Sequence, residues 1–172
     1  MDNSNHHPEQ PQSFSYSVET LQQIADDVLT LAHKGGADAC EMNVSEGSGQ
    51  NVTVRQGEVE TIEYTRDKGL SITVHIGHKR GNASSSDFSP QAIRETVSAA
   101  LSIARYTADD IYAGLADQDL LATSFPDLDL YHPWSLPVEE AIELARQCEA
   151  AALATDKRIT NSEGASVSAG AS

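Results

Sequence analysis

In the stretch GLSITVHI (residues 69–76), apolar and polar residues alternate without a break. Leu70, Ile72, Val74 and Ile76 are separated by Ser71, Thr73 and His75. A period of two places the apolar side chains on one face of a β-strand, so this stretch predicts a half-buried strand of a sheet. We expect Ile72 and Val74 to lie nearest the centre of that sheet and Ile76 to be less buried.

The flanking segments carry weaker forms of the same pattern. Before residue 69 it predicts strands at Cys40–Val44, Val52–Val54 and Val59–Tyr64, with turns at Gly47–Gly49, Gln56–Gly57 and Asp67–Gly69. After residue 76, a turn at Lys79–Gly81 should lead into a short polar strand, Asn82–Ser86, at a sheet edge. The pattern indicates an antiparallel sheet of about four to five strands.

Helical spacing of apolar residues predicts three helices, Ser17–Lys34, a second from Pro90 to about Ala104, and Pro137–Ala154. Ser17 and Ser89 are suitable N-caps, and Gly35-Gly36 is a suitable stop for the first helix. The order helix, strands, helix, helix is typical of an α+β domain in which helices pack on one face of an antiparallel sheet.

The pattern also predicts how the chain is organised. We expect a disordered polar tail at residues 1–15, one α+β domain at 16–164, and a loosely paired, truncated segment at 165–172 that leads to an absent C-terminal domain. Residues 107–135 lack a regular pattern and contain six aspartates. We interpret them as a strap with one short helical turn, whose leucines (Leu115, Leu120, Leu121, Leu128 and Leu130) pack against the domain.

The composition excludes several functional classes. The formal net charge is −15 and the pI is about 4.5, so the surface should repel nucleic acids and anionic membranes. No signal peptide and no apolar run long enough to span a bilayer is present, which indicates a cytoplasmic protein. Cys40 and Cys148 are too few and too isolated for a disulfide framework, and we expect both thiols to be buried.

Arrangements of side chains that support catalysis or metal binding are missing. The six histidines form no His-Glu-x-x-His; His6 and His7 should be a flexible pair, and His75 and His78 should face opposite sides of a solvated edge. Ser84–Asp87 is better explained as a strand-to-helix turn than as part of a serine triad. The Asp-x-Asp pairs at 117/119 and 127/129 lack the rest of an EF-hand. We predict no catalytic residue and no metal ligand, while substrate-binding residues are unknown.

Seven segments follow one another in an order that matches a known family. They are RQGEVETIEY (55–64), GLSITVHIGHKRGNASSSDFSPQAI (69–93), ALSIARYTADD (100–110), AGLAD (113–117), PDLDLYHP (126–133), EEAIELA (139–145) and DKRITNSEGAS (156–166). In these segments the chain resembles the N-terminal region of the PmbA/TldE branch of the TldD/PmbA metalloprotease family. An older label for this family is "modulator of DNA gyrase".

The resemblance implies a non-catalytic, non-metal-binding subunit of a cytosolic TldD/TldE-type complex that acts in peptide maturation and proteolysis. Its partner would be a TldD-like subunit, which holds the metal on a His-Glu-x-x-x-His helix, and its substrate an unfolded peptide bound through the complex. No cofactor is then expected in this chain. The alternative is a free-standing acidic protein-interaction domain with no role in proteolysis.

Overall fold

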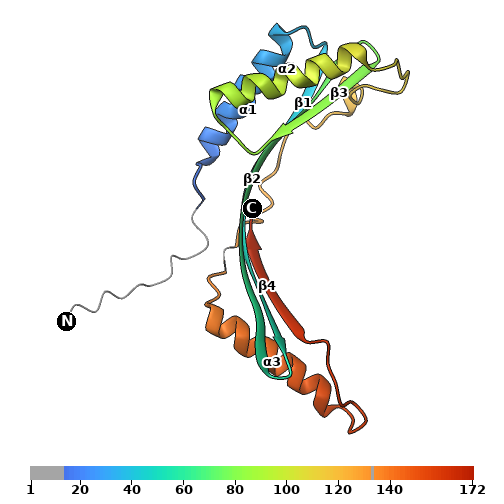
Figure 1. Ribbon diagram of the computed structural model, residues 1–172. Helices are drawn as coiled ribbons and strands as arrows, with labels where there is room; N and C mark the ends of the chain where they lie inside the picture. The colour runs from blue at the N-terminus through green and yellow to red at the C-terminus, as the bar shows by residue number, and fades with distance from the viewer. Residues whose placement is uncertain (1–13, 133) are drawn as a thin grey trace, which may run out of the picture. The chain divides into compact units, whose positions relative to one another are not determined.

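The computed structural model describes residues 14–132 and 134–172. The expected tail, with His6 and His7, therefore lies almost entirely outside the described residues. The elements in chain order are α1 (Val18–Lys34), β1 (Ala39–Arg55), β2 (Glu58–Ile76), β3 (Lys79–Ser85), α2 (Pro90–Tyr106), η1 (Gln118–Leu120), α3 (Val138–Ala154) and β4 (Ala165–Ala171). The strands pair in the order β3-β2-β1-β4 and are antiparallel, which confirms the α+β prediction (Figure 1).

Contacts divide the chain into two compact units that share the long strands β1 and β2. The first unit contains Ser15–Glu46 and Asp67–Asp129. The second unit contains Gly47–Arg66, Leu130–Ser172 and, of the described N-terminal residues, Phe14. The strand and helix patterns of the sequence contain no sign of this division.

The first unit has a core between α1, α2 and its strands (Figure 1). Ile72 and Val74 are fully buried and Ile76 only partly, as the alternation predicted. Both helices begin where expected, because the Ser17 and Ser89 hydroxyl oxygens accept hydrogen bonds from the backbone N–H of Thr20 and Ala92. The buried members of this core are Ile24, Val28, Ala32, Ala37, Leu70, Ile72, Val74, Phe88, Ile93, Val97, Ala100, Leu101 and Ala104.

The second unit has a separate, smaller core under α3. Val52 and Val54 of β1 pack against Leu136 and against Ala141 and Ala145 of α3. The Gln50 amide, which is buried, donates a hydrogen bond of 2.6 Å to the Leu136 carbonyl oxygen. The start of α3 at Val138 and its end at Ala154 agree with the sequence prediction.

Two of the expected turns are wrong, because β1 continues through Gly47–Gly49 and β2 continues through Asp67–Gly69. The glycines of β1 are where another strand approaches closely: Gly49 is opposite Gly170 of β4, and a Cβ on Gly49 would lie 3.3 Å from the Ala169 carbonyl oxygen. The turn expected at Lys79–Gly81 is also displaced. It lies at Gly77 and His78, and Lys79 already belongs to β3.

The expectation of loose pairing from residue 165 onward is wrong as well. Ala165–Ala171 form β4, which pairs antiparallel with β1 from Val54↔Ala165 to Ser48↔Ala171. Val167 and Ala169 pack against the core of the second unit. This small-residue strand has little local preference for the β conformation, and its partner is more than a hundred residues away in the sequence, so the pairing is tertiary in origin.

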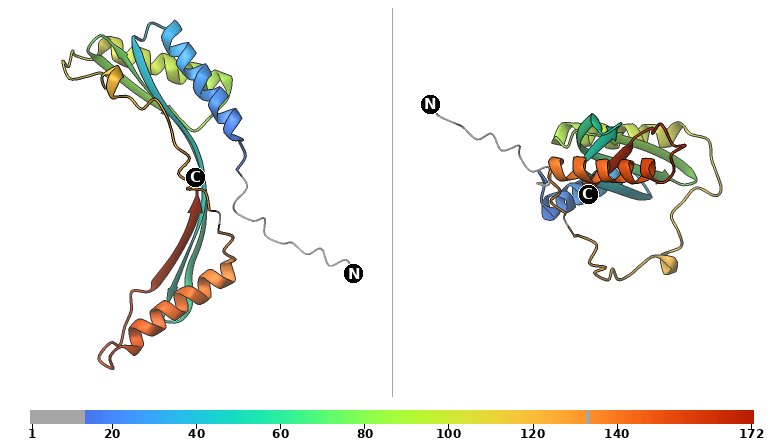
Figure 2. Two further views of the ribbon diagram at one scale, coloured as in Figure 1. Left: turned by 180° about the vertical axis from the view of Figure 1, so that it is seen from behind. Right: turned by 90° about the horizontal axis from the view of Figure 1, so that it is seen from below.

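The segment between α2 and α3 is irregular and contains one short helical turn, η1, as predicted (Figure 2). The expectation that its leucines pack is wrong, because Leu115, Leu120, Leu121, Leu128 and Leu130 are all exposed. Within the described part of the chain, no helix has both the length and the apolar character needed to cross a bilayer.

Candidate functional site

The hairpin that joins β1 to β2 in the second unit turns at Gln56 and Gly57. Their φ angles are +55° and +78°, which is typical of the tight two-residue turns that suit the twist of antiparallel strands. The sequence predicted this turn correctly. Glycine adopts such an angle without cost, whereas the non-glycine residue Gln56 needs support from its surroundings.

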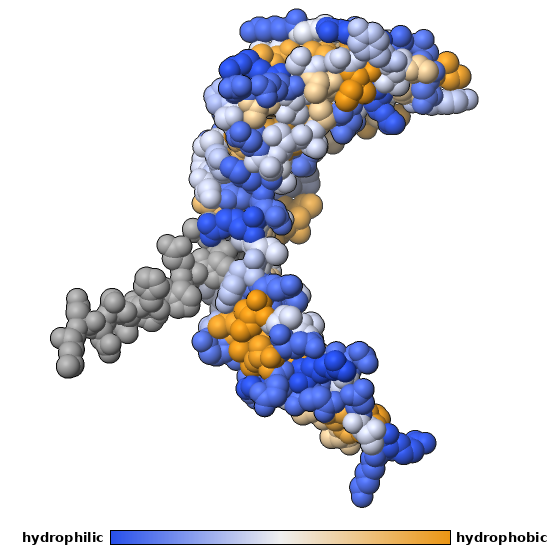
Figure 3. All heavy atoms as spheres, viewed as in Figure 1, coloured by the Kyte–Doolittle hydropathy of each residue, from blue (hydrophilic) through white to orange (hydrophobic). Residues whose placement is uncertain are grey.

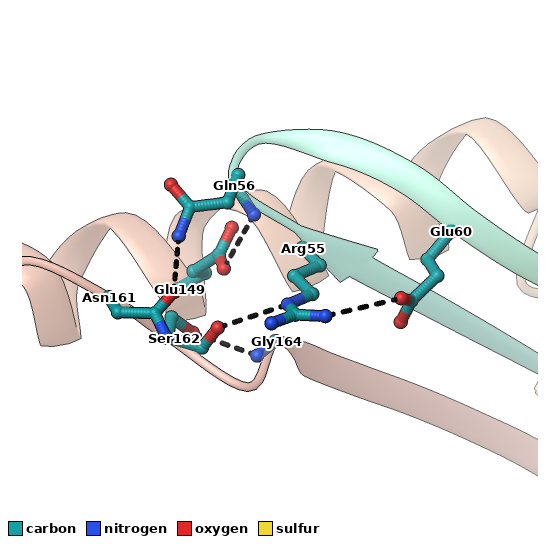
Figure 4. A network of polar contacts seen from close by, with 7 residues as sticks. All are labelled: Arg55, Gln56, Glu60, Glu149, Asn161, Ser162 and Gly164. Atoms are coloured by element: carbon teal, nitrogen blue, oxygen red, sulfur yellow. Dashed lines mark hydrogen bonds and ion pairs between the residues drawn. The ribbon is translucent and has the colours of Figure 1, made fainter.

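Glu149 of α3 supplies that support (Figure 4). Its side chain is only 2% exposed, and its two carboxylate oxygens accept the backbone N–H groups of Gln56 at 2.9 Å and Gly57 at 2.8 Å. These bonds, from Gly57 first and Gln56 second, hold the pKa of Glu149 below its usual value of 4.5, and burial opposes them. Glu149 is therefore a carboxylate whose charge is used to clamp the turn.

Further polar contacts fix the same turn on its other sides, and Figure 4 shows those made by Arg55 and Gln56. The Arg146 Nε–H donates to the Gly57 carbonyl oxygen at 2.9 Å. The Gln56 side-chain amide donates to Asn161 Oδ1 at 2.8 Å, and the Arg55 Nε–H donates to the Ser162 carbonyl oxygen at 3.3 Å. Both α3 and the segment after it thus hold the hairpin tip in place.

Directly after this turn in the chain, residues 58–66 of β2 form an open sheet edge. β3 pairs only with Leu70–Ile76, so within the described residues this part of β2 has a strand on one side only, and all its residues are exposed. Such an edge can pair with another extended chain through its free backbone groups. Its three glutamates (Glu58, Glu60 and Glu63) make indiscriminate edge-to-edge association unfavourable.

The first unit contains a shallow open depression with polar walls. Hydroxyl and amide side chains from three neighbouring strands dominate it, together with one cation, Lys68. The Lys68 ammonium donates to the Tyr16 hydroxyl at 3.2 Å and lies over the Tyr16 and Phe88 rings, so it is already engaged. The lining residues are Asn43, Ser45, Lys68, Gly69, Leu70, Ser71, Ser84, Ser85 and Ser86.

The structure separates the histidines that the sequence analysis considered. His75 lies in β2 and is only 4% exposed, while His78 lies in the exposed turn before β3. The expectation of a solvated edge is therefore wrong for His75. Neither ring nitrogen of His75 has a hydrogen-bond partner among the described residues.

Ser84–Asp87 performs the role of a strand-to-helix turn, as predicted. The Asp87 carboxylate accepts the Ser89 backbone N–H at 2.8 Å and the Ser89 hydroxyl at 3.0 Å. These two bonds, in that order, lower the pKa of Asp87. The Ser85 hydroxyl oxygen accepts the Asp87 backbone N–H, so this serine also caps the turn.

The cysteines and aspartates do not form a metal centre in the described part of the chain, where no three His, Cys, Asp or Glu side chains come close enough to hold an ion. The expectation of two buried thiols is wrong: Cys148 is exposed, and Cys40 is half-buried, with its thiol pKa raised by desolvation. On α3, burial follows Ala141, Ala145 and Glu149 at intervals of four, which turns Cys148 outward.

Sequence reasoning missed Glu149, because a glutamate on a helix is usually a solvated residue. One signal was available: Glu149 continues the small-residue positions Ala141 and Ala145 at a spacing of four, where the side chain has to point at the sheet.

Replacing Glu149 by alanine should lower the melting temperature by roughly 5 °C, because two turn N–H groups lose their acceptor. Amide exchange at Gln56 and Gly57 should become more than about tenfold faster. Because the folded-state pKa lies below 4.5, the carboxylate stabilises the fold fully above that pH and loses its effect as the pH falls through the folded-state pKa. The difference between wild type and variant should thus shrink on acidification.

Glu143→Ala is the matched control for that measurement. Glu143 lies on the same helix but is exposed, and its carboxylate accepts a hydrogen bond from the Gln147 side-chain amide at 2.9 Å. Its removal should leave the melting temperature nearly unchanged. Equal effects of the two variants, or a Glu149 effect that persists at low pH, would contradict the clamp.

Two family models match the chain in sequence order. The model described as PmbA/TldA metallopeptidase domain 1 matches residues 40–104, and the one described as PmbA/TldA metallopeptidase central domain matches residues 131–172. The metalloprotease PmbA of Escherichia coli O157:H7 is 50% identical over 152 residues, which cover 87% of this chain and 34% of that protein. The metalloprotease PmbA homolog of Haemophilus influenzae is 49% identical over 146 residues, covering 85% and 32%. The chain thus spans about a third of the length of these relatives.

Solved structures share the fold at lower identity. A Bacteroides thetaiotaomicron protein described as a modulator of DNA gyrase superposes with a TM-score of 0.72 at 24% identity, covering 90% of this chain and 34% of that one. TldE from Thermococcus kodakarensis superposes with a TM-score of 0.54 at 17% identity, covering 74% of this chain and 30% of its own.

Proposed function

Because this chain belongs to the PmbA/TldD metallopeptidase family, we propose that it is the N-terminal part of the non-catalytic subunit of a cytosolic TldD/TldE-type protease. In this proposal the chain itself holds no metal, and a TldD-like partner supplies the metal and the activated water. The two subunits act on unfolded peptides in peptide maturation and proteolysis.

Hydrolysis of a peptide bond at neutral pH needs an activated nucleophile and a group that stabilises the developing charge. Two of the side chains that the sequence analysis considered for such roles have structural tasks here, because Asp87 and Ser85 cap a turn. The buried carboxylate of Glu149, which the sequence analysis did not consider, is engaged in clamping another turn. The proposal therefore assigns the chemistry to the partner, where a metal can polarise the carbonyl and activate water.

The observation that carries the structural part of the proposal is the open edge of β2 at residues 58–66. An unfolded peptide or a strand of the partner subunit can extend the sheet there, with backbone hydrogen bonds that do not depend on sequence. The clamp on Gln56 and Gly57 holds the beginning of this edge in a fixed conformation, which reduces the entropy lost on pairing. The chain thus forms a wall of the chamber in which the partner cleaves.

Reconstitution tests this function. The full-length protein mixed with its TldD-like subunit should cleave an unstructured peptide, and replacing the metal-binding histidines of the partner should abolish cleavage. Full-length protein alone should be inactive after rigorous removal of contaminating proteases. Metal-dependent cleavage by this protein without a partner would overturn the proposal.

Proline substitutions test the β2 edge within the same assay. Backbone groups of successive strand residues point to opposite neighbours, and the two-residue turn predicts that Thr61 points its N–H away from β1 and Ile62 towards it. Thr61→Pro should keep the fold and reduce cleavage by about tenfold or more. Ile62→Pro should disturb the hairpin itself, as seen in faster amide exchange in β1. Full activity of a folded Thr61→Pro protein would exclude the edge as a pairing site.

A further inference from the structure

Residues 106–129 of the first unit comprise the last residue of α2 and most of the segment 107–135 that the sequence analysis interpreted as a strap. This part, named here the acidic apolar strap, exposes many large apolar side chains. Tyr112 is 89% and Phe125 85% exposed. Single exposed apolar residues are common, but a long run of them on a folded surface marks a site of interaction. Orange, apolar residues interrupt the hydrophilic surface of the first unit in Figure 3. The exposed apolar residues of the strap are Tyr106, Ile111, Tyr112, Leu115, Leu120, Leu121, Phe125 and Leu128.

The strap is also strongly acidic. Residues 107–129 contain six aspartates (Asp109, Asp110, Asp117, Asp119, Asp127 and Asp129) and neither lysine nor arginine. Two of these carboxylates shape the local backbone, since Asp110 accepts the Tyr112 N–H at 3.0 Å and Asp127 accepts the Asp129 N–H at 2.9 Å. The exposed apolar side chains therefore alternate with negatively charged side chains, and no lysine or arginine lies among them in the sequence.

The first half of the strap has an ordered backbone with one bond to the rest of the first unit, although its apolar side chains lie outside the core. The Asp110 N–H donates to the His78 carbonyl oxygen at 2.9 Å, next to the end of β2. The Ala113 N–H donates to Asp110, and the Leu120 N–H donates to Asp117, so short local turns fix the chain between these points. A partly ordered apolar segment loses less entropy on docking than a disordered one.

We propose that the acidic apolar strap docks on a second polypeptide whose surface is apolar and bordered by lysine and arginine. The inference rests on the proposed function in naming the TldD-like subunit as that polypeptide. Charge decides against a second copy of this chain, because two straps would bring carboxylates together without a compensating cation. A basic border would pair with Asp109, Asp117 and Asp119, while the aromatic side chains supply the desolvated centre of the interface.

The first experiment locates what covers the strap. Full-length protein is oxidised by hydroxyl radicals, alone and with the TldD-like subunit, and analysed by mass spectrometry. Tyr112 and Phe125 should be labelled in the protein alone and protected at least about tenfold in the complex. Leu144, which is exposed on α3 outside the strap, is the internal control and should be labelled equally in both samples.

The second experiment measures affinity for the TldD-like subunit by calorimetry. Combining Ile111→Ser, Tyr112→Ser and Phe125→Ser should weaken binding by about tenfold or more. Combining Asp109→Asn, Asp117→Asn and Asp119→Asn should weaken binding at low salt and flatten its dependence on salt. Val18→Ser combined with Leu144→Ser, which also removes exposed apolar side chains, should leave the affinity unchanged.

Each other outcome overturns the proposal in a distinguishable way. Protection of the strap in the full-length protein alone would mean that another part of the same chain covers it, and protection that rises with concentration would mean a second copy. Unchanged affinity of the strap variants, with cleavage intact, would exclude the strap but leave the proposed function standing. Absence of any binding by the wild-type protein would remove the proposed function and the docking partner together.

Discussion

Replacing Gly81 by alanine should destabilise the first unit by about 3 kcal/mol, the upper end of the cost of overpacking. Gly81 lies in β3 directly under α2. A Cβ at this position would overlap the Ala100 carbonyl oxygen and would lie 2.5 Å from the Ala104 backbone nitrogen. Both obstacles are backbone atoms of a helix, so no side-chain rotation relieves the overlap. Only a shift of α2 away from the sheet could accommodate the methyl group, at the cost of the packing of Val97 and Ala100.

The matched control is Gly69→Ala. Gly69 lies in β2, its φ is outside the left-handed region, and a Cβ there would meet no atom within 4 Å. Urea denaturation followed by circular dichroism should place this variant within about 0.5 kcal/mol of the wild type. If Gly81→Ala fails to accumulate as folded protein while Gly69→Ala does, the prediction is also confirmed, because the loss of stability is then large enough to prevent folding. Equal stability of both variants would show that α2 does not lie where the structure places it.

Replacing Ile72 by alanine should cost about 2–5 kcal/mol in the free energy of unfolding. Ile72 is completely buried, and it belongs to the core that α1 and α2 share with β2. Truncation removes three methyl or methylene groups from a site surrounded by branched side chains. The neighbours can fill only part of the space, so a cavity term adds to the lost transfer free energy.

Ile62→Ala provides a control with the same chemical change in the same strand. Ile62 lies in the open edge of β2 and is 44% exposed, so its truncation should change the free energy of unfolding by about 0.5 kcal/mol or less. Ten residues apart in β2, the two side chains share one period-two face and differ in whether other side chains cover them. Similar losses at positions 62 and 72 in chemical denaturation would therefore contradict the complete burial of Ile72.

Short-range patterns were enough to place the helices. Ser17, Ser89 and Pro90 mark helix starts, because the groups that satisfy the first N–H donors of a helix are local in sequence. The buried stripe of α2 follows from its periodicity alone. The alternation in residues 69–76 was sufficient for the face and the relative burial of that part of β2, because side-chain direction in a strand has a fixed period.

The continuity of the strands could not be predicted in this way. Gly47–Gly49 and Asp67–Gly69 resemble turns, but the hydrogen bonds of neighbouring strands keep both segments extended. Residues typical of turns indicate the conformation that a segment prefers when no neighbouring strand forms hydrogen bonds with it. Where a partner such as β4 is present, a glycine can instead permit close approach of two strands, as Gly49 and Gly170 do.

In the candidate site, too, the sequence predicted the local turn, whereas only the tertiary structure revealed the contacts that hold it. The turn at Gln56 and Gly57 is visible in the sequence, but its clamp, Glu149, is more than ninety residues away. The exposure of the acidic apolar strap was also hidden, since apolar residues in a pattern-free segment suggest packing as readily as an interface. Only the tertiary structure shows that Tyr112 and Phe125 lie outside the core.

The sequence by itself therefore determined the α+β class, the three helices, the hairpin turn and the family. The class, the helices and the turn depend on local capping, turn residues and side-chain periodicity. The family depends on segments that follow one another along the chain in the same order as in its members. The tertiary structure alone decided the division into two units, the pairing of β4, the burial of Glu149 and the open edge at residues 58–66. Each of these depends on contacts between segments far apart in the chain, and the free energy of such contacts is not encoded in the preferences of either segment taken separately.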